Sequence, residues 1–370
     1  MKSRISKLHA GALLTIDLAA ICDNWRLLRS HVGPADCAGV VKADAYGLGA
    51  ARVAPALAAA GCRQFFVAHL AEGVELRPKL PADATLYLLH GVPPGAESDA
   101  AAHDVVPVLS SRQQIDGWRH LAARLGRRLR AIVQVDSGMA RLGLSATELR
   151  QVGDDPAAFE GIDIAFVMSH LACADEPGNP ANAAQLERFV AARRLLPSAR
   201  ASLANSSGIF LGGAWHFDLA RPGAALYGVN PTPCAANPMR AVVRLSAKVI
   251  QTREVEAGAG VGYGLTWVAA RPSRIATVSV GYADGYLRSL SSSGSAWFNG
   301  VELPVAGRVS MDTITLDMSA LPDGALQAGS MVDLLSPEHG VDEAAARAGT
   351  IGYEILTSLG QRYAREYVGI

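Results

Sequence analysis

The chain lacks the marks of several protein classes, and these absences narrow its function before any motif is considered. Its five cysteines (Cys22, Cys37, Cys62, Cys173 and Cys234) are odd in number, scattered and without CxxC spacing. They argue against a disulfide framework and a zinc site, so we expect no metal, and they suit a reducing cytoplasm. Neither sign of charge is in excess, because Lys plus Arg and Asp plus Glu each number 34. This balance argues against nucleic acid as a partner.

Long apolar runs are missing as well. No segment approaches the roughly 20 apolar residues of a membrane-spanning helix. Basic residues precede a mildly apolar N-terminal stretch, but Asp17 interrupts it, whereas a signal peptide needs an unbroken apolar core. We therefore expect a cytoplasmic protein with no membrane partner. Its 370 residues, 50% hydrophobic and 18% charged, are enough for a barrel and a smaller domain.

Short apolar runs recur between helical patterns through the first two thirds of the chain. Each has the length of a strand and is largely apolar on both faces, as expected of a parallel strand covered by helices. The runs are 38–41, 65–68, 85–89, 105–109, 131–135, 164–168, 202–204 and 217–219. Eight such alternations predict an α/β fold with an N-terminal (β/α)8 TIM-type barrel. A doubly wound sheet is the alternative, since a count of strands from sequence is easily wrong by one.

The segments between these runs carry helical periodicity. Ser111 and Gln114 predict a capping box at the start of one helix. Leu186, Phe189 and Val190 indicate the apolar face of another amphipathic helix.

The pattern changes near residues 231–238. Beyond them, β-like runs at 242–249, 275–280, 313–316 and 331–335 are broken by Gly and Pro, with no regular helices between them. We predict a barrel domain at 17–236 and a mostly β domain at 237–370. A strand at 13–16 precedes the first barrel strand, so we assign residues 11–16 to the later domain.

The most informative segment is VVKADAYGLG at residues 40–49. Its Lys42 ends the first predicted barrel strand and so points toward the mouth where barrel active sites lie. A partly desolvated lysine there has a lowered amine pKa and can form a Schiff base. By position alone, a lysine extending from a strand end into solvent is the commoner interpretation.

This segment closely resembles the cofactor-lysine signature of alanine racemases, and further matches follow in the order of that family. They are VDSGMAR at 135–141, SH at 169–170, ANS at 204–206, RPG at 221–223, VGYG at 261–264, GYADG at 281–285, GRVSMD at 307–312 and Tyr353. One match alone would be weak, but an ordered series across both predicted domains is specific. The resemblance implies a fold-type III enzyme that interconverts L- and D-alanine, for peptidoglycan or for alanine catabolism.

The resemblance also implies two acid–base groups in a homodimer with shared active sites. Lys42 would carry pyridoxal phosphate and act on one face of the substrate. Tyr263, which the second domain supplies to the partner subunit, would act on the other face. Proton delivery to both faces of a planar carbanion requires a group on each side. A phenol with an ordinary pKa near 10 needs help to act as a base at neutral pH. His170 and Arg221 resemble the family's polar chain that would provide it.

The remaining site residues follow from the same resemblance. Arg221 would face the pyridine nitrogen, where its permanent charge disfavours protonation and therefore transamination. Small residues after the last two barrel strands would let backbone N–H groups approach the phosphate. The expected cofactor-binding residues are Lys42, Tyr46, His170, Asn205, Ser206, Arg221, Gly223, Ala224 and Tyr353, and the expected substrate-binding residues are Arg141, Met311, Asp312 and Tyr282. Gln134 departs from the pattern, because several family members have a supporting lysine there, and this leaves the orientation of Arg141 open.

Two other functions fit part of this pattern. Pyridoxal-dependent amino-acid decarboxylases share the barrel-plus-β architecture, but they would carry an acidic partner for the pyridine nitrogen where this chain has Arg221. A small pyridoxal-phosphate-binding homeostasis protein has a similar barrel but lacks a second β domain. The racemase is the favoured hypothesis.

Overall fold

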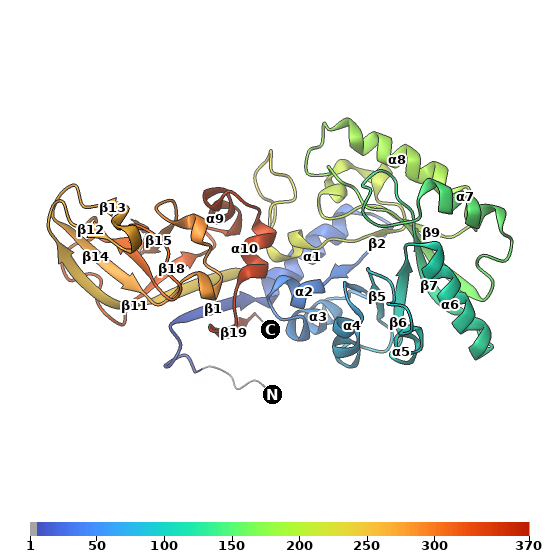
Figure 1. Ribbon diagram of the computed structural model, residues 1–370, viewed down its shortest axis with the longest axis horizontal. Coiled ribbons are helices and arrows are strands. Elements are labelled where there is room, and N and C mark those ends of the chain that lie inside the picture. The colour runs from blue at the N-terminus through green and yellow to red at the C-terminus, as the bar shows by residue number, and fades with distance from the viewer. Residues whose placement is uncertain (1–5, 370) are drawn as a thin grey trace. The chain divides into compact units, whose positions relative to one another are not determined.

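The computed structural model describes residues 6–369 and divides into two compact units, drawn in Figure 1. The β unit comprises the residues up to Ile21, Tyr227–Val229 and the chain from Arg240 onward. The barrel unit comprises Cys22–Leu226 and Asn230–Met239. Within residues 6–369, no helix combines the length and apolar character needed to cross a membrane.

An eight-stranded sheet organises the β unit, with β16, β15, β18, β11, β1 and β19 in that order, while β14 joins β11 and β17 joins β14. The N-terminal strand β1 lies antiparallel to β11 and parallel to β19, which confirms its predicted pairing with the later part of the chain. Its residues alternate between buried and half-buried, the period of a strand with one face on the core. The bounds are β1 Ala12–Asp17, β11 Val243–Val255, β14 Ser273–Val278, β15 Ser295–Phe298, β16 Val301–Pro304, β17 Ile314–Asp317, β18 Met331–Leu335 and β19 Ala364–Val368.

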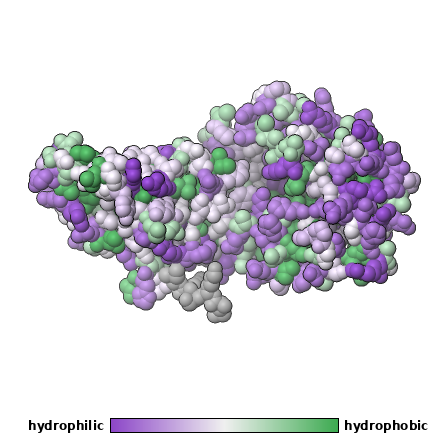
Figure 2. Space-filling view, viewed as in Figure 1, coloured by the Kyte–Doolittle hydropathy of each residue, from purple (hydrophilic) through white to green (hydrophobic). Residues whose placement is uncertain are grey.

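The rest of the β unit is made of short elements. The hairpin of β12 (Gly260–Val261) and β13 (Trp267–Val268) encloses the turn η5 (Tyr263–Leu265). Figure 2 shows hydrophobic residues gathered at the end of this unit that carries β12 and β13, where Leu265 and Val268 are exposed. The other elements are η6 Tyr282–Asp284, η7 Arg288–Leu290, α9 Val341–Ala348 and α10 Gly352–Ser358, and neither helix follows from the β-like sequence pattern.

The barrel unit is built on parallel strands that neighbour each other in chain order. Strands β3 to β9 form a seven-stranded sheet. Every residue of β6 is buried, as expected of a strand covered by helices on one side and filling the barrel on the other. The bounds are β2 Asp36–Cys37, β3 Gly39–Val40, β4 Gln64–Val67, β5 Thr85–Leu88, β6 Val105–Leu109, β7 Leu129–Gln134, β8 Ile162–Met168, β9 Arg200–Ser202 and β10 Leu219–Ala220.

Strand β10 closes the barrel. It pairs in parallel with β2, and the N–H of Val40 donates to the carbonyl of Pro222 (3.1 Å). On its other side, the N–H of Arg221 donates to the carbonyl of Ala204 (2.9 Å). The predicted barrel is therefore confirmed, and the sequential strand order excludes a doubly wound sheet. The last strand begins later than predicted, because Phe217 has a left-handed φ of 52° that interrupts the extended backbone.

Helices connect most of the barrel strands. The side chain of Ser111 accepts the N–H of Gln114, but the side chain of Gln114 accepts the N–H of Ser110, so only half of the predicted capping box forms. In α8, Val190 is exposed and Gln185 is buried, so the predicted apolar face is wrong by part of a turn. The helices are α1 Leu18–His31, α2 Lys42–Tyr46, α3 Ala50–Ala59, α4 Leu70–Leu76, α5 Glu97–Ala102, α6 Arg112–Leu125, α7 Ala146–Asp154 and α8 Pro180–Arg193. The short turns are η1 Arg77–Lys79, η2 Ser207–Leu211, η3 Gly213–Trp215 and η4 Ala224–Tyr227.

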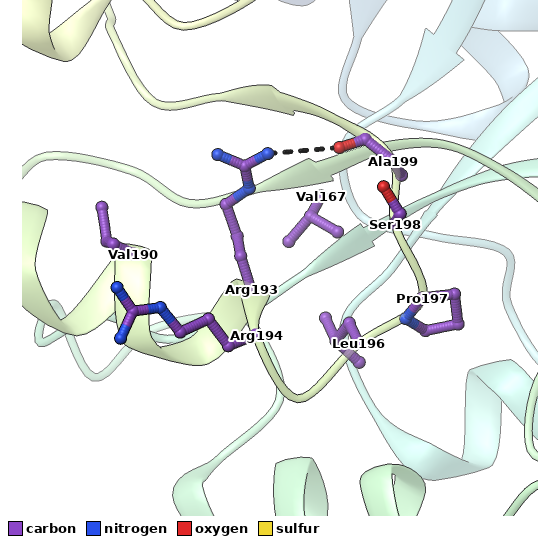
Figure 3. Close-up of a pocket in the computed structure, with 8 residues that line it drawn as sticks. All are labelled: Val167, Val190, Arg193, Arg194, Leu196, Pro197, Ser198 and Ala199. Atoms are coloured by element: carbon purple, nitrogen blue, oxygen red, sulfur yellow. Dashed lines mark hydrogen bonds between the residues drawn. The ribbon is translucent and has the colours of Figure 1, made fainter.

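A hollow of about 360 Å³ lies on the barrel wall where α8 ends (Figure 3). Its lining includes Arg193, Arg194 and Ser198, and the Arg193 guanidinium donates to the carbonyl of Ala199 (3.3 Å). These residues lead into the start of β9, the end of the strand opposite to the mouth. Because barrel active sites lie at the carboxyl ends of the strands, we do not assign this hollow to catalysis.

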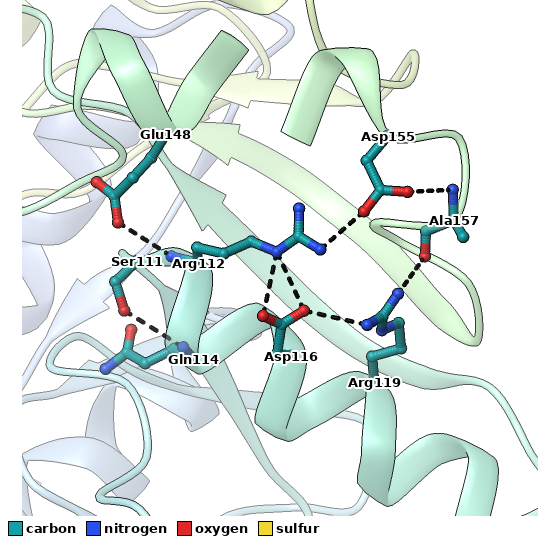
Figure 4. Close-up of polar contacts among 8 residues, drawn as sticks. All are labelled: Ser111, Arg112, Gln114, Asp116, Arg119, Glu148, Asp155 and Ala157. Atoms are coloured by element: carbon teal, nitrogen blue, oxygen red, sulfur yellow. Dashed lines mark hydrogen bonds and ion pairs between the residues drawn. The ribbon is translucent and has the colours of Figure 1, made fainter. Parts of the chain in front are cut away.

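An ion-pair cluster joins α6 to the chain around α7 (Figure 4). Arg112 Nε lies 3.1 Å from both carboxylate oxygens of Asp116, and its Nη2 lies 2.7 Å from Asp155. Arg119 also donates to Asp116 (3.2 Å), and the N–H of Arg112 donates to Glu148 (3.2 Å). A network in which one guanidinium serves two carboxylates is more stabilising than an isolated surface pair.

We expect Arg112→Met to lower the melting temperature by roughly 1–2 °C, the shift that about 1 kcal/mol produces in a chain of 370 residues. Arg112 lowers the pKa of Asp155 by hydrogen bonding, so this stabilisation is present at neutral pH and is lost as the pH falls through that lowered pKa. The difference from wild type should therefore shrink in acid, which scanning calorimetry at several pH values would measure. Arg26→Met, which breaks the single exposed pair with Asp23, is the control. Equal shifts in both variants would contradict the special role of the cluster.

Candidate active site

Lys42 lies at the mouth of the barrel, directly after β3. The preceding residue is held in the sheet, because the N–H of Val41 donates to the carbonyl of Phe66 (2.8 Å). Burial lowers the pKa of the Lys42 amine, the nearby charge of Arg141 lowers it further, and Glu72 opposes both. More of the amine is then neutral near pH 7, and the neutral amine is the nucleophile.

The loop after β7 presents Arg141 at the same end of the barrel. Asp136 Oδ1 accepts the N–H groups of Gly138, Met139 and Ala140 at 2.8, 3.0 and 3.2 Å. Gln134 is buried, and its amide donates to the carbonyl of Leu142 (3.3 Å). This chain therefore uses the neutral amide of Gln134 to hold the loop, and the Arg141 side chain remains exposed.

Arg221 is a buried cation at the end of β10. Its guanidinium donates to the hydroxyl of Ser202, to the carbonyls of Ser169 (2.6 Å) and Leu203 (3.4 Å), and to Nδ1 of His170 (3.5 Å). Within residues 6–369 it makes no ion pair with a carboxylate, so its charge is balanced by neutral acceptors alone. Burial lowers its pKa to about 9, so it stays protonated at neutral pH.

His170 is neutral in this environment. Burial and the charges of Arg221, Arg141 and Lys42 lower its pKa to about 3. Since Nδ1 faces the Arg221 donor, it acts as the acceptor, and the ring proton belongs on Nε2. The imidazole can therefore donate one hydrogen bond from Nε2 to a further group.

Small polar groups gather after the ends of β9 and β10, in an arrangement that suits a phosphate. Ser206 Oγ accepts the N–H groups of Gly223 (3.0 Å) and Ala225 (3.3 Å). A Cβ on Gly223 would lie 2.3 Å from the hydroxyl of Tyr46, so a larger residue there would displace the Tyr46 side chain. Two hydroxyls and backbone N–H groups thus converge at the usual phosphate position of this fold, and Ala224 is buried beside them. With Lys42 and Arg221 at the same mouth, these residues fit pyridoxal phosphate.

Asn205 has a local role next to this pocket. Its side-chain oxygen accepts the N–H of Gly208 (2.9 Å), and its amide faces the carbonyl of Leu171 (3.4 Å). It therefore shapes the turn that follows β9 and places Ser206.

Gln185 is a site residue that the sequence analysis missed. Its amide nitrogen donates to the carbonyl of His170 (3.0 Å) and lies 3.4 Å from the hydroxyl of Ser137, and its oxygen accepts the N–H of Ala172 (2.8 Å). It thereby ties α8 to the loops after β7 and β8. The available signal was a glutamine one residue before the predicted apolar face of this helix.

The other expected site residues lie in the β unit. Tyr263 is 71% exposed on the turn η5, between Gly262 and Gly264, whose φ angles of 75° and 71° form the turn. Tyr282, Met311 and Tyr353 are also among its exposed large side chains. Exposure of several large side chains on one unit is typical of a surface that another molecule covers.

Arg362 fixes the two loops that carry Tyr282 and Met311. Its guanidinium contacts both oxygens of the buried Asp284 (2.6 and 2.8 Å) and one oxygen of Asp312 (2.7 Å). A Cβ on Gly281 would lie 2.3 Å from the carbonyl of Met311, so the two loops are packed backbone to backbone. Asp312 therefore holds the loop through an ion pair.

No group of three or more His, Cys, Asp or Glu side chains in the described part of the chain could hold a metal ion. The barrel mouth offers an amine, a guanidinium, an imidazole, and the hydroxyl and backbone N–H groups around Ser206. These groups suit an organic cofactor with a phosphate and an aldehyde.

Comparison with known proteins agrees with this geometry. Residues 16–231 match the model of the alanine racemase N-terminal domain, and residues 242–367 match that of the C-terminal domain. A catabolic alanine racemase of Mesorhizobium japonicum is 57% identical over 99% of this chain and 95% of its own length, and an alanine racemase of Brucella canis is 52% identical over 98% and 94%. The crystal structure of alanine racemase from Bartonella henselae with covalently bound pyridoxal phosphate is 44% identical, with a TM-score of 0.94 over 97% of this chain and 100% of that one.

Proposed function

The chain belongs to the alanine racemase family and racemises alanine, and we propose that it does so with Lys42 of one subunit and Tyr263 of the partner subunit as its two acid–base groups. The observation that carries this proposal is the partly desolvated Lys42 at the same mouth as the buried Arg221 and the polar groups around Ser206. Arg221 has no carboxylate partner among the described residues, and this also argues against the decarboxylase alternative, which would need a carboxylate there. The matching C-terminal domain argues against the homeostasis protein.

The cofactor is pyridoxal phosphate, which supplies an electron sink that acidifies the α-hydrogen of the bound amino acid. Lys42 would hold it covalently, and Tyr46, Ser206, Gly223 and Ala224 would hold its phosphate. Arg221 would face the ring nitrogen and keep it unprotonated, because a fixed cation disfavours a second one beside it. Asn205 would act by placing Ser206.

Proton transfer would take place at two atoms on opposite faces of the substrate. Lys42 Nζ would take or return the α-proton on one face, and the Oη of Tyr263 of the partner subunit on the other. The Nε2–H of His170 would donate to that phenolate and stabilise it, since Arg221 keeps Nδ1 as an acceptor.

We propose that Arg141 and the backbone N–H of Met311 bind the substrate carboxylate. Tyr282 and Tyr353 would border the substrate, and Asp312 would contribute through its pair with Arg362. The exposed side chains of the β unit support a homodimer, since a two-fold interface would cover them and bring Tyr263 to a second barrel. The 57% identity to a racemase named as catabolic favours alanine degradation over peptidoglycan supply as the role of this enzyme. We expect it to be located in the cytoplasm.

The cofactor site can be tested directly, because the chain has only five lysines: Lys2, Lys7, Lys42, Lys79 and Lys248. We expect the purified protein to be yellow, borohydride to bleach it, and mass spectrometry to find the reduced cofactor on Lys42. The bleached protein should lose its racemisation of alanine. Recovery of the label on another lysine would contradict the assignment.

Parallel assays with serine and lysine would define the substrate range, since an added hydroxyl is rejected only about 10²-fold by a snug apolar pocket.

A further inference from the structure

The backbone directly after Lys42 is left-handed for four residues. Ala43, Asp44, Ala45 and Tyr46 have φ angles of 53–55°, and none of them is glycine. For a residue with a Cβ, the left-handed form is less stable than the right-handed one, because the Cβ lies too close to the following carbonyl oxygen. A run of this kind persists only where neighbouring groups hold it in place.

Glu72 in the first turn of α4 is such a group. Its Oε1 accepts the N–H of Ala43 (2.5 Å), and its Oε2 accepts the N–H groups of Ala68 (2.7 Å) and His69 (2.9 Å). One carboxylate thus joins the residue after Lys42 to the end of β4. At the far side of the turn, Asp44 Oδ1 accepts the N–H of Ala50 (2.7 Å) and closes the turn onto α3.

The Glu72 carboxylate is stabilised by backbone N–H groups. Within residues 6–369 it makes no ion pair, so three backbone N–H groups stabilise its carboxylate. Its negative charge also acts on Lys42 in the direction opposite to burial and to Arg141. Two further titratable groups interact electrostatically with Lys42: His90, which follows β5, and His170, which follows β8. The charge of Lys42 lowers the pKa of both imidazoles.

We propose that Glu72 is the positioning residue of the cofactor lysine: its carboxylate fixes the left-handed turn at 43–46 and thereby the direction of the Lys42 amine. This rests on the proposed role of Lys42 as the cofactor carrier. Glu72 acts through the backbone of Ala43, whose N–H it accepts. A side chain that only capped α4 would need the N–H groups of Ala68 and His69, without that of Ala43.

Two variants separate positioning from helix capping. Glu72→Gln keeps the shape but removes the charge and one of the two acceptor oxygens. Glu72→Asp keeps the charge in the first turn of α4, but it is one methylene shorter and cannot span Ala43 and His69 together. Glu75→Gln, on the exposed side of the same helix, is the matched control.

Measurements on the apoprotein report on the lysine without relying on turnover. In competitive acylation followed by mass spectrometry, the midpoint pH of Lys42 labelling should fall in Glu72→Gln, because a neighbouring negative charge is lost. Labelling of Lys248, which lies on β11 of the β unit, should stay unchanged. Titration with pyridoxal phosphate should show an affinity at least about tenfold weaker in both Glu72 variants, the effect of losing one charged hydrogen bond. In the reconstituted enzymes, kcat should fall with little change in KM.

The outcomes are distinct. If Glu72→Asp melts at the wild-type temperature but still binds pyridoxal phosphate weakly, positioning is supported. If Glu72→Asp has the wild-type melting temperature and the wild-type cofactor affinity, the inference is overturned. It is also overturned if Glu72→Gln and Glu72→Asp match Glu75→Gln in labelling and affinity. Failure of the proposed function has its own signature, because borohydride would then label a lysine other than Lys42 in the wild-type protein.

Discussion

Lys42→Ala and Tyr263→Ala homodimers should each lose nearly all racemase activity, whereas dimers re-paired at random from the two variants should recover about a quarter of the wild-type rate. If each active site takes Lys42 from one subunit and Tyr263 from its partner, one site of a mixed dimer inherits both defects and the other inherits neither. Half of the randomly formed dimers are mixed, and each has one intact site of two. Co-expression with two affinity tags would allow the mixed dimer to be isolated and assayed.

A second pairing provides the control. A mixed dimer of wild type with the double variant Lys42→Ala, Tyr263→Ala has one defect in each shared site, so it should be inactive. If both residues acted within one chain, this dimer would keep one working site, and the mixture of single variants would stay inactive. The two pairings therefore give opposite results under the two arrangements, and loss of folding in one variant cannot imitate either pattern.

Arg221→Glu should change which reaction the enzyme performs. Arg221 is a buried cation without a carboxylate partner in the described residues, so it would repel a proton from the ring nitrogen of the cofactor. A carboxyl group in its place would let that nitrogen hold a proton and draw carbanion charge into the ring. We expect racemisation to fall by at least about 10²-fold, the scale of a lost charge interaction in a desolvated site. A larger fraction of turnovers should end as pyruvate and pyridoxamine phosphate.

Arg221→Lys is the control, because it keeps the positive charge but cannot reproduce all the guanidinium hydrogen bonds to Ser202, Ser169 and Leu203. It should lose activity without gaining transamination. Mass spectrometry of the cofactor after exhaustive turnover measures the fraction. An unchanged fraction in Arg221→Glu would show that reaction choice does not depend on charge at the ring nitrogen.

The architecture could be predicted from local patterns in the sequence. The strand-length apolar runs, the helical segments between them and the later alternating runs each reflect neighbours within a few residues, and such periodicities survive translation into structure. Lys42 could be assigned to the barrel mouth for a related reason, whereas Arg141, His170 and Arg221 could be assigned to the site by the family resemblance. Lys42 follows a predicted parallel strand, and the carboxyl ends of such strands share one edge of a barrel.

Only the tertiary structure decided how these residues are held. The contact of Glu72 with Ala43 joins residues 29 apart, and Arg362 reaches Asp284 and Asp312 over 78 and 50 residues. Gln185 faces inward on α8, opposite to the expectation from its polarity, because three partners on other elements compensate its burial. The left-handed turn after Lys42 runs against the local preference of Ala, Asp and Tyr, so no propensity could indicate it. Local preference determines which elements form, whereas strained and buried polar positions depend on partners that only the folded chain brings together.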